Sequence, residues 1–113
     1  MSQSVKPIVI TDSATGNQYT IEYNRESVLF AESRGFKFAD VGDYLMTKLP
    51  ELWFYGFRMH HKSVSRQKTD ALLDGIGALP EGFLERLGAL YAEPYNQLLE
   101  GNPDETPFVT VTL

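Results

Sequence analysis

Cysteine is absent from this sequence of 113 residues, and its absence excludes several kinds of site. Without a thiol, the chain cannot form a disulfide bond, a zinc–thiolate centre or a cysteine nucleophile. No apolar run reaches the length of a membrane-spanning helix, and residues 1–7 lack the apolar core of a signal peptide. We therefore expect a soluble protein that is neither exported nor bound to a membrane.

An excess of positive charge is also lacking. The chain has 10 lysines and arginines against 15 aspartates and glutamates, which gives a formal net charge of −5. Because phosphate binding depends largely on clustered lysine and arginine, this charge argues against nucleic acid as the main partner.

The length of the chain allows one modest hydrophobic core and hardly two, so we predict a single domain over residues 1–113. Residues 5–23 are predicted to form a β-hairpin, because two β-rich segments flank turn-forming residues. Residues 24–101 carry helical patterns, and residues 102–113 form a C-terminal tail. The predicted fold class is α+β, with the hairpin packed on a small bundle of about four helices.

Three of these helices are predicted from their end residues and their periodicity. Asn24 suits the N-cap of the first helix, which is expected to stop at Gly35. The fourth helix is predicted to start with Pro80 in its first turn and to be kinked at Pro94. The third helix is short, and turn-forming residues bound it: Ser63 or Ser65 at the start, Gly75 and Gly77 at the end.

The C-terminal tail alternates apolar residues with threonines, which is typical of a strand. Val109, Val111 and Leu113 fall on one side of this pattern. Two outcomes stay open: the tail is a strand that pairs with the hairpin, or it is an exposed strand-like segment.

Residues 49–62 contain the only tryptophan and much of the aromatic content, and we predict that they form the central helix. Pro50 suits the first turn of such a helix, because its missing N–H would be unpaired there in any case. The helix would be apolar around most of its circumference, so it needs cover on more than one side, from the domain or from a partner. The only stripe expected to face water consists of Glu51, Tyr55, Arg58 and Lys62.

His60 and His61 are the obvious candidates for a metal site or a general base. Neighbouring residues on a helix project about 100° apart, and the sequence has no further histidine and no cysteine to complete a metal shell. No serine–histidine–aspartate order or nucleophile elbow is present either. We therefore predict no metal, no cofactor and no catalytic residues, and interpret the pair as helix-end histidines favoured by the helix dipole.

A local basic cluster stands out in the otherwise acidic chain. It could bind nucleic acid or an acidic protein surface, but acidic residues follow it closely, which favours internal pairing or a solvated face. The basic residues are Arg58, His60, His61, Lys62, Arg66 and Lys68. The acidic residues that follow are Asp70, Asp74, Glu81 and Glu85.

Several stretches together resemble the small tail assembly chaperones of long-tailed (siphovirus-type) bacteriophages and prophages. The resemblance covers most of the chain, and its most telling part is the block from Leu49 to His61, followed by a serine-capped helix with Lys68, Thr69 and Asp70. The other stretches are Tyr19 to Val28, Glu32 to Phe36 and Ser65 to Leu73.

The resemblance implies a binding protein with no catalytic residues and no cofactor. Members of that family associate with the tape measure protein in the host cytoplasm, keep it soluble and recruit the major tail protein. They are not expected in the mature virion, and some are also made in a longer, frameshifted form. Self-association is a further possibility.

A tape measure segment would present amphipathic helices, for which a groove lined by aromatic residues and methionine is a suitable receptor. We expect this groove along the central and fourth helices, with charged residues at its border. The predicted partner-binding residues are Trp53, Phe54, Phe57, Arg58, Met59 and Lys62. The main alternative is a DNA-associated phage or bacterial regulator that uses the basic cluster, and a third is an enzyme whose site the sequence does not reveal.

Overall fold

The computed structural model describes residues 5–100 and 108–113. It opens with an antiparallel β-hairpin of two strands, β1 (Ile8–Thr11) and β2 (Gln18–Ile21), in which Ile8 lies opposite Ile21 and Thr11 opposite Gln18. Asp12 organises the turn, because its carbonyl accepts the N–H of Gly16 at 2.7 Å. The predicted hairpin is confirmed.

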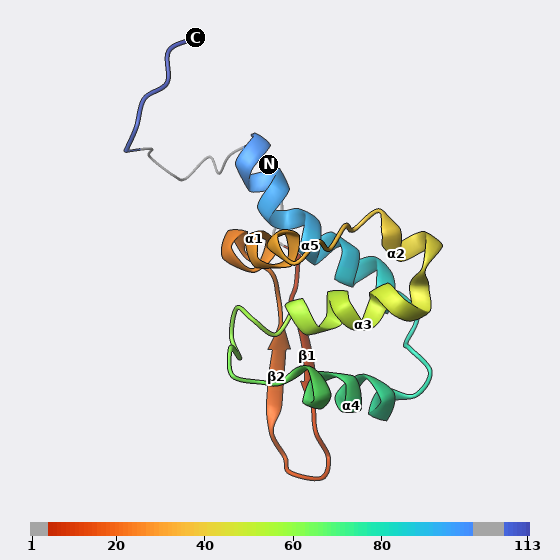
Figure 1. Cartoon of the computed structure of the whole chain (residues 1–113). Coiled ribbons are helices and arrows are strands. Elements are labelled where there is room, and N and C mark those ends of the chain that lie inside the picture. Colours follow the sequence, from red (N-terminus) through yellow and green to blue (C-terminus); the bar gives the residue numbers. More distant parts are fainter. Residues whose placement is uncertain (1–4, 101–107) are drawn as a thin grey trace.

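Five helices follow in the described part of the chain, so the predicted α+β class is also confirmed. In Figure 1, α3 and α4 lie across the hairpin, whereas α1 and α5 lie at the end away from the hairpin turn. The helices are α1 (Arg25–Ser33), α2 (Asp40–Asp43), α3 (Leu45–Tyr55), α4 (Arg66–Ile76) and α5 (Phe83–Glu100).

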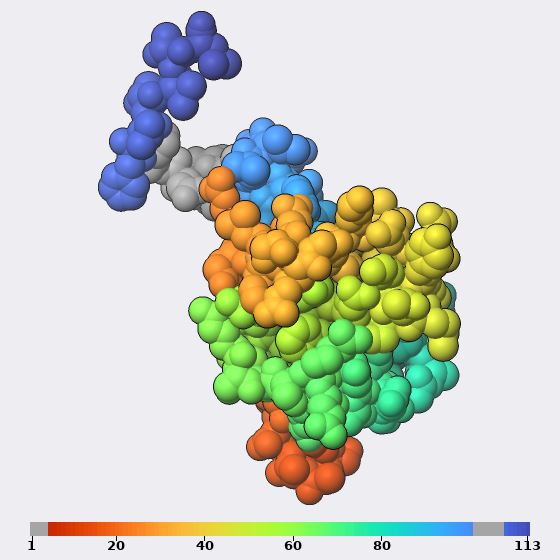
Figure 2. Space-filling view, viewed as in Figure 1, coloured from red at the N-terminus to blue at the C-terminus, as the bar shows by residue number. Residues whose placement is uncertain are grey.

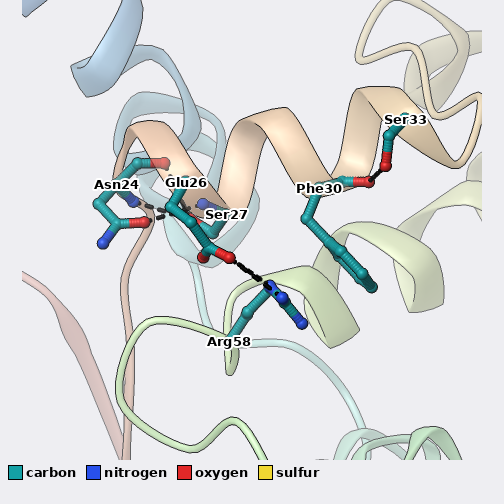
Figure 3. Close-up of polar contacts among 6 residues, drawn as sticks. All are labelled: Asn24, Glu26, Ser27, Phe30, Ser33 and Arg58. Atoms are coloured by element: carbon teal, nitrogen blue, oxygen red, sulfur yellow. Dashed lines mark hydrogen bonds and ion pairs between the residues drawn. The ribbon is translucent and has the colours of Figure 1, made fainter.

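Two of these helices begin where the sequence predicts. The Asn24 side chain accepts the N–H of Ser27 at 2.9 Å, and the Ser27 hydroxyl accepts the N–H of Asn24 at 2.8 Å, which makes a reciprocal capping box at the start of α1 (Figure 3). Gly35 follows α1 with a φ of +84°, as a left-handed stop requires. Ser65 caps α4 by accepting the N–H of Lys68 at 3.1 Å.

The central helix differs from its predicted bounds of residues 49–62. Helix α3 starts at Leu45 and ends at Tyr55, so Pro50 lies inside the helix and not in its first turn. The hairpin sets the end: the N–H of Glu22 donates to the carbonyl of Gly56 at 3.0 Å. A Cβ at position 56 would lie 2.5 Å from the Ile21 Cγ2 atom, so only glycine allows the two segments to come this close. Residues 56–60 then form turns.

Helix α5 also starts later than predicted, at Phe83. The carbonyl of Pro80 accepts the N–H of Phe83 at 3.1 Å, and Gly82 has a φ of +82°, so residues 80–83 form a β-turn before the helix. Pro94 is buried, and α5 continues past it to Glu100. The predicted helix stop after Glu100 lies outside the described residues.

The core lies where the hairpin, α3 and α5 meet. Its polar atoms are paired: the Tyr23 hydroxyl donates to the Leu52 carbonyl at 2.6 Å, and the Trp53 indole N–H donates to the Thr69 carbonyl at 2.9 Å. These bonds join the hairpin to α3 and α3 to α4. The largest fully buried apolar side chains are Trp53, Phe57, Ile21, Leu52, Leu87 and Leu90.

Residues 108–113 are exposed and form no strand, so the described part of the tail is the exposed segment and not a partner of the hairpin. The first residues of the predicted tail, up to residue 107, lie outside the described part of the chain. Among the described helices, none is both long and apolar enough to cross a membrane.

Candidate functional site

The two histidines are not helix-end residues, because α3 stops at Tyr55. His60 Nε2 lies 2.8 Å from Glu22 Oε1, whereas His61 Nε2 accepts the backbone N–H of Thr20 at 2.9 Å. The pKa of His61 is lowered, first by burial and then by the neighbouring His60. Both rings therefore tie the turn after α3 to the hairpin. Within residues 5–100 and 108–113, no group of three or more histidine, aspartate or glutamate side chains could hold a metal ion.

The basic cluster is largely neutralised by carboxylates. Arg58 Nε donates to Glu26 Oε1 at 3.0 Å, and its guanidinium lies 3.7 Å from the ring centroid of Phe30 (Figure 3). Of the predicted acidic partners only Asp70 takes part; the others come from the hairpin and α1. The pairs are Arg58–Glu26, His60–Glu22, Arg66–Asp70 and Lys68–Asp12. Among the described arginines and lysines of the cluster, only Lys62 has no described carboxylate partner.

The predicted partner-binding residues do not form one surface. Trp53 and Phe57 are 0% and 1% exposed, and their rings pack together with centroids 5.1 Å apart in the core. Met59 and Lys62 are exposed, whereas Phe54 and Arg58 are partly buried. The expectation that Trp53 and Phe57 contact a partner is therefore wrong for this fold, because the hairpin and the other helices already cover them.

Tyr55 is a second correction, since it was predicted to face water. It is buried, and its ring lies edge-on to Phe30 at 5.9 Å and to Phe36 at 5.4 Å between centroids. The stripe expected to face water therefore faces α1 at this point.

Exposed aromatic rings gather elsewhere, in a groove of about 370 Å³ between α5 and the loop after α1. The Phe38 ring stacks on Tyr91 with centroids 5.3 Å apart and planes 15° from parallel. Gly88 allows this contact, because a Cβ there would lie 3.1 Å from the end of the Phe38 ring. We call this feature the aromatic groove; it is lined by Glu32, Gly35, Phe36, Lys37, Phe38, Tyr91 and Tyr95.

The tyrosines of the aromatic groove are held as neutral phenols. Burial raises the pKa of Tyr91, and burial together with Glu32 raises the pKa of Tyr95. The Tyr95 hydroxyl donates to the Glu32 carboxylate, which fixes the ring at the edge of the groove. Glu32 and Lys37 are exposed and give the groove a charged rim.

The apolar surface continues from the aromatic groove along α5. Tyr91, Tyr95 and Leu98 follow each other at helical spacing, and Leu98 is 57% exposed. Leu99 is 81% exposed. Figures 1 and 2 show this end of α5, in blue, standing out from the rest of the molecule beside α1. We call Phe38, Tyr95, Leu98 and Leu99 the α5 surface.

Sequence reasoning placed a groove partly on the fourth helix but missed the loop that completes it. The helical spacing of Tyr91, Tyr95 and Leu98 indicates one apolar helix face, but the sequence gives no sign of where burial ends along it. The available signal was the alternation of Phe36, Lys37 and Phe38. In an extended segment, alternate residues share a side, so Phe36 and Phe38 fall on the same side.

Comparison with known protein families gives a match. The family described as "Domain of unknown function (DUF5055)" matches residues 1–111. No curated protein and no solved structure matches the chain. With nearly all of its length covered by that match, the chain belongs to the DUF5055 family.

Proposed function

We propose that this protein is a tail assembly chaperone of a long-tailed bacteriophage or prophage. It binds the tape measure protein in the host cytoplasm, keeps it soluble and recruits the major tail protein. The observation that carries the proposal is the α5 surface, where aromatic and leucine side chains lie exposed beside a groove of about 370 Å³. The resemblance described above supplies the identity of the partner.

The aromatic groove suits the apolar face of an amphipathic helix. Such a helix places anchors at intervals of three or four residues, and a concave strip of rings accepts them. Tyr95 and Phe38 offer rigid apolar area, and the Tyr95 hydroxyl is already bonded to Glu32, so a partner does not have to satisfy it. Leu98 and Leu99 extend the strip beyond the groove.

Of the contact residues first predicted, Arg58, Met59 and Lys62 keep a secondary role in this proposal. Arg58 lies against α1 through Glu26 and Phe30, and α1 also carries Glu32 of the groove rim. A charge at such a border acts mainly on the association rate and is screened by salt. Met59 and Lys62 are exposed in the same turn region. Arg58→Ala should therefore weaken partner binding mostly at low ionic strength.

The direct test is to co-express the tape measure protein of the same genome with this chain and to measure how much of it stays soluble. Tyr95→Ala and Leu98→Ala should each reduce affinity by about 2 kcal/mol or more if they are central anchors, roughly a thirtyfold change. Met46→Ala is the matched control, because Met46 is 89% exposed and does not line the groove.

Circular dichroism must show that each variant is folded. The proposal fails if the tape measure protein is equally soluble without this chain. It also fails, as far as the α5 surface is concerned, if Tyr95→Ala and Leu98→Ala behave like Met46→Ala.

A further inference from the structure

One edge of the β-hairpin is covered by groups that are not strands. The N–H of Thr20 donates to His61 Nε2 at 2.9 Å, and the N–H of Glu22 donates to the carbonyl of Gly56 at 3.0 Å. Both N–H groups point away from β1. The turn after α3 therefore closes the outer edge of β2.

The other edge is open. Val9 lies opposite Thr20 and Thr11 opposite Gln18 in the register of the hairpin. In an antiparallel pair, residues opposite outward-pointing residues also turn their backbone groups outward, so those of Val9 and Thr11 face away from β2. No hydrogen bond links these outward groups to any described residue. Such an edge is a template for another strand.

Space for a strand lies along this edge. A cavity of about 470 Å³ separates the end of β1 and the hairpin turn from α4. On the α4 side it is lined in part by the small residues Ala71 and Gly75. A second cavity, of about 300 Å³, lies between the start of β1 and the turn before α5. Neither helix therefore covers the backbone of β1 from the side.

The described end of the tail has the composition of a strand, and the other described residues leave it exposed. Its residues alternate Val109, Val111 and Leu113 with two threonines, and β-branched residues favour strands. Their exposed fractions run from 74% for Val109 to 114% for Leu113. Paired with β1, the apolar residues would share the inward face of Ile8 and Ile10.

The path of the chain does not favour pairing between the C-terminal tail and β1 of the same molecule. The N–H of Val5 donates to Glu93 Oε1 at 2.6 Å, so β1 starts beside α5 and then runs toward the hairpin turn, whereas α5 ends on the opposite side (Figure 1). A tail that returned directly to its own β1 would therefore enter at the start of the strand and run parallel to it. Parallel pairing is the less stable arrangement.

An antiparallel return would have to pass the whole of β1 first. The stretch of α5 beyond Glu93 is about 10 Å long. The chain from Val5 to the hairpin turn is about 23 Å long. The chain between Glu100 and Phe108 can reach at most about 29 Å when fully extended. This reach is too short to pass back along the end of α5 and then along the whole of β1.

We propose that the C-terminal segment 108–113 of one copy adds as an antiparallel strand to the open edge of β1 in a second copy. The main-chain hydrogen bonds of Val9 and Thr11 supply affinity, and the alternation of the tail fixes its register. The self-association that results does not depend on the tape measure protein or on the α5 surface.

Sedimentation velocity of the full chain and of a chain truncated after residue 107 tests the proposal. The full chain should sediment as a dimer or a larger assembly, and the truncated chain as a monomer. Val9→Pro removes one outward N–H at an edge position that tolerates proline, and it should also give a monomer. The control is Val9→Thr, which keeps the N–H and should still assemble.

Mixing two monomeric variants distinguishes exchange between copies from pairing within one chain. The Val9→Pro chain keeps its tail, and the truncated chain keeps its open edge, so together they should form a one-to-one complex that neither forms alone. Circular dichroism must show both to be folded. Val111→Lys serves as a second variant of the tail, the segment that one copy provides in the proposed contact. A monomeric full chain, or a mixture that stays monomeric, overturns the proposal.

Discussion

Gly56 shows how one residue ends a helix through tertiary contact. Its φ of −69° is ordinary for any residue, so the position needs glycine for space alone. A Cβ there would meet Ile21 Cγ2 at 2.5 Å and the Tyr23 hydroxyl at 3.0 Å. The limit on α3 thus comes from β2, more than thirty positions earlier in the sequence.

Gly56→Ala should destabilise the protein by about 1–3 kcal/mol, because the added methyl group overpacks a rigid contact. Gly75→Ala in α4 is the matched control: apart from its own helix backbone and chain neighbours, no described atom would lie within 4 Å of a Cβ there, so it should stabilise by about 0.5–1 kcal/mol through helix propensity. Urea unfolding of both variants measures the difference. Equal effects would show that the approach of β2 to position 56 is not tight.

His61 should make stability depend on pH. Its folded pKa lies below the usual 6.5, because the ring is partly buried and lies near His60, so the unfolded chain takes up the proton first as pH falls. The contribution of His61 to the free energy of unfolding is fully present above pH 6.5. It is lost as the pH falls through 6.5 and then through the lowered pKa of the folded state. Protonation at Nε2 would also remove the acceptor for the Thr20 N–H.

His61→Gln keeps an acceptor but does not titrate, so its free energy of unfolding should fall less than that of the wild type across this pH range. Urea unfolding at several pH values compares the two. Parallel curves would mean that the His61 proton is not linked to folding.

The residues whose structural roles could be predicted from the sequence are those whose hydrogen-bond partners lie nearby in the chain. Asn24 and Ser65 cap helices through N–H groups three residues away. Asn24 was predicted as a cap, and Ser65 was one of two predicted candidates beside Ser63. Gly56 and His61 act through Ile21, Glu22 and Thr20, which a local pattern does not reveal. Their roles therefore became visible only in the folded chain.

At the scale of elements, α3 and α5 supply the centre of the core. Leu52 and Leu87 are both 0% exposed. Leu52→Ala and Leu87→Ala should each cost about 2–5 kcal/mol, because truncation removes buried apolar area and leaves a cavity. Met46→Ala, on α3 but 89% exposed, should stay within about 0.5 kcal/mol of the wild type. Thermal and urea unfolding measure all three, and core losses as small as the Met46 change would place the core elsewhere.

The hairpin and helices α1 and α4 could be predicted because their patterns and end signals agree. The pattern also located α5, but its start signal, Pro80, lies in the turn before the helix. Helix α3 was misplaced because apolar density alone does not distinguish a helix from a buried turn. Phe57 is 1% exposed although it lies after the end of α3. Its burial comes from Trp53 and Tyr19, whose rings lie 5.1 Å and 5.8 Å away between centroids.

At the scale of the whole molecule, the ion pairs bear on the DNA-binding alternative. Arg58, Arg66 and Lys68 each have a carboxylate partner, and the formal net charge is −5. We expect no appreciable binding of duplex DNA at low salt, as measured by fluorescence anisotropy. Binding that weakens steeply with salt and is reduced by Lys62→Ala would support the regulator instead.

The candidate site could be predicted only in part, because it is assembled from distant segments. Tyr91 and Tyr95 come from α5, whereas Phe38 comes from the loop before α2. The sequence indicated an apolar helix but not that the body of the protein stops covering it near Tyr95. That limit is set by where α1 ends and by the Glu32–Tyr95 contact.

The burial of the only tryptophan has an optical consequence. Trp53 is 0% exposed, and its indole N–H is bonded to the Thr69 carbonyl, so its emission reports on the packing of α3 against α4. The α5 surface carries tyrosine but no tryptophan. Excitation of the indole should therefore give a spectrum that shifts to the red when the protein unfolds and stays constant when a ligand occupies the aromatic groove. Indole emission can thus report loss of structure in the unlabelled protein without interference from a ligand in the groove.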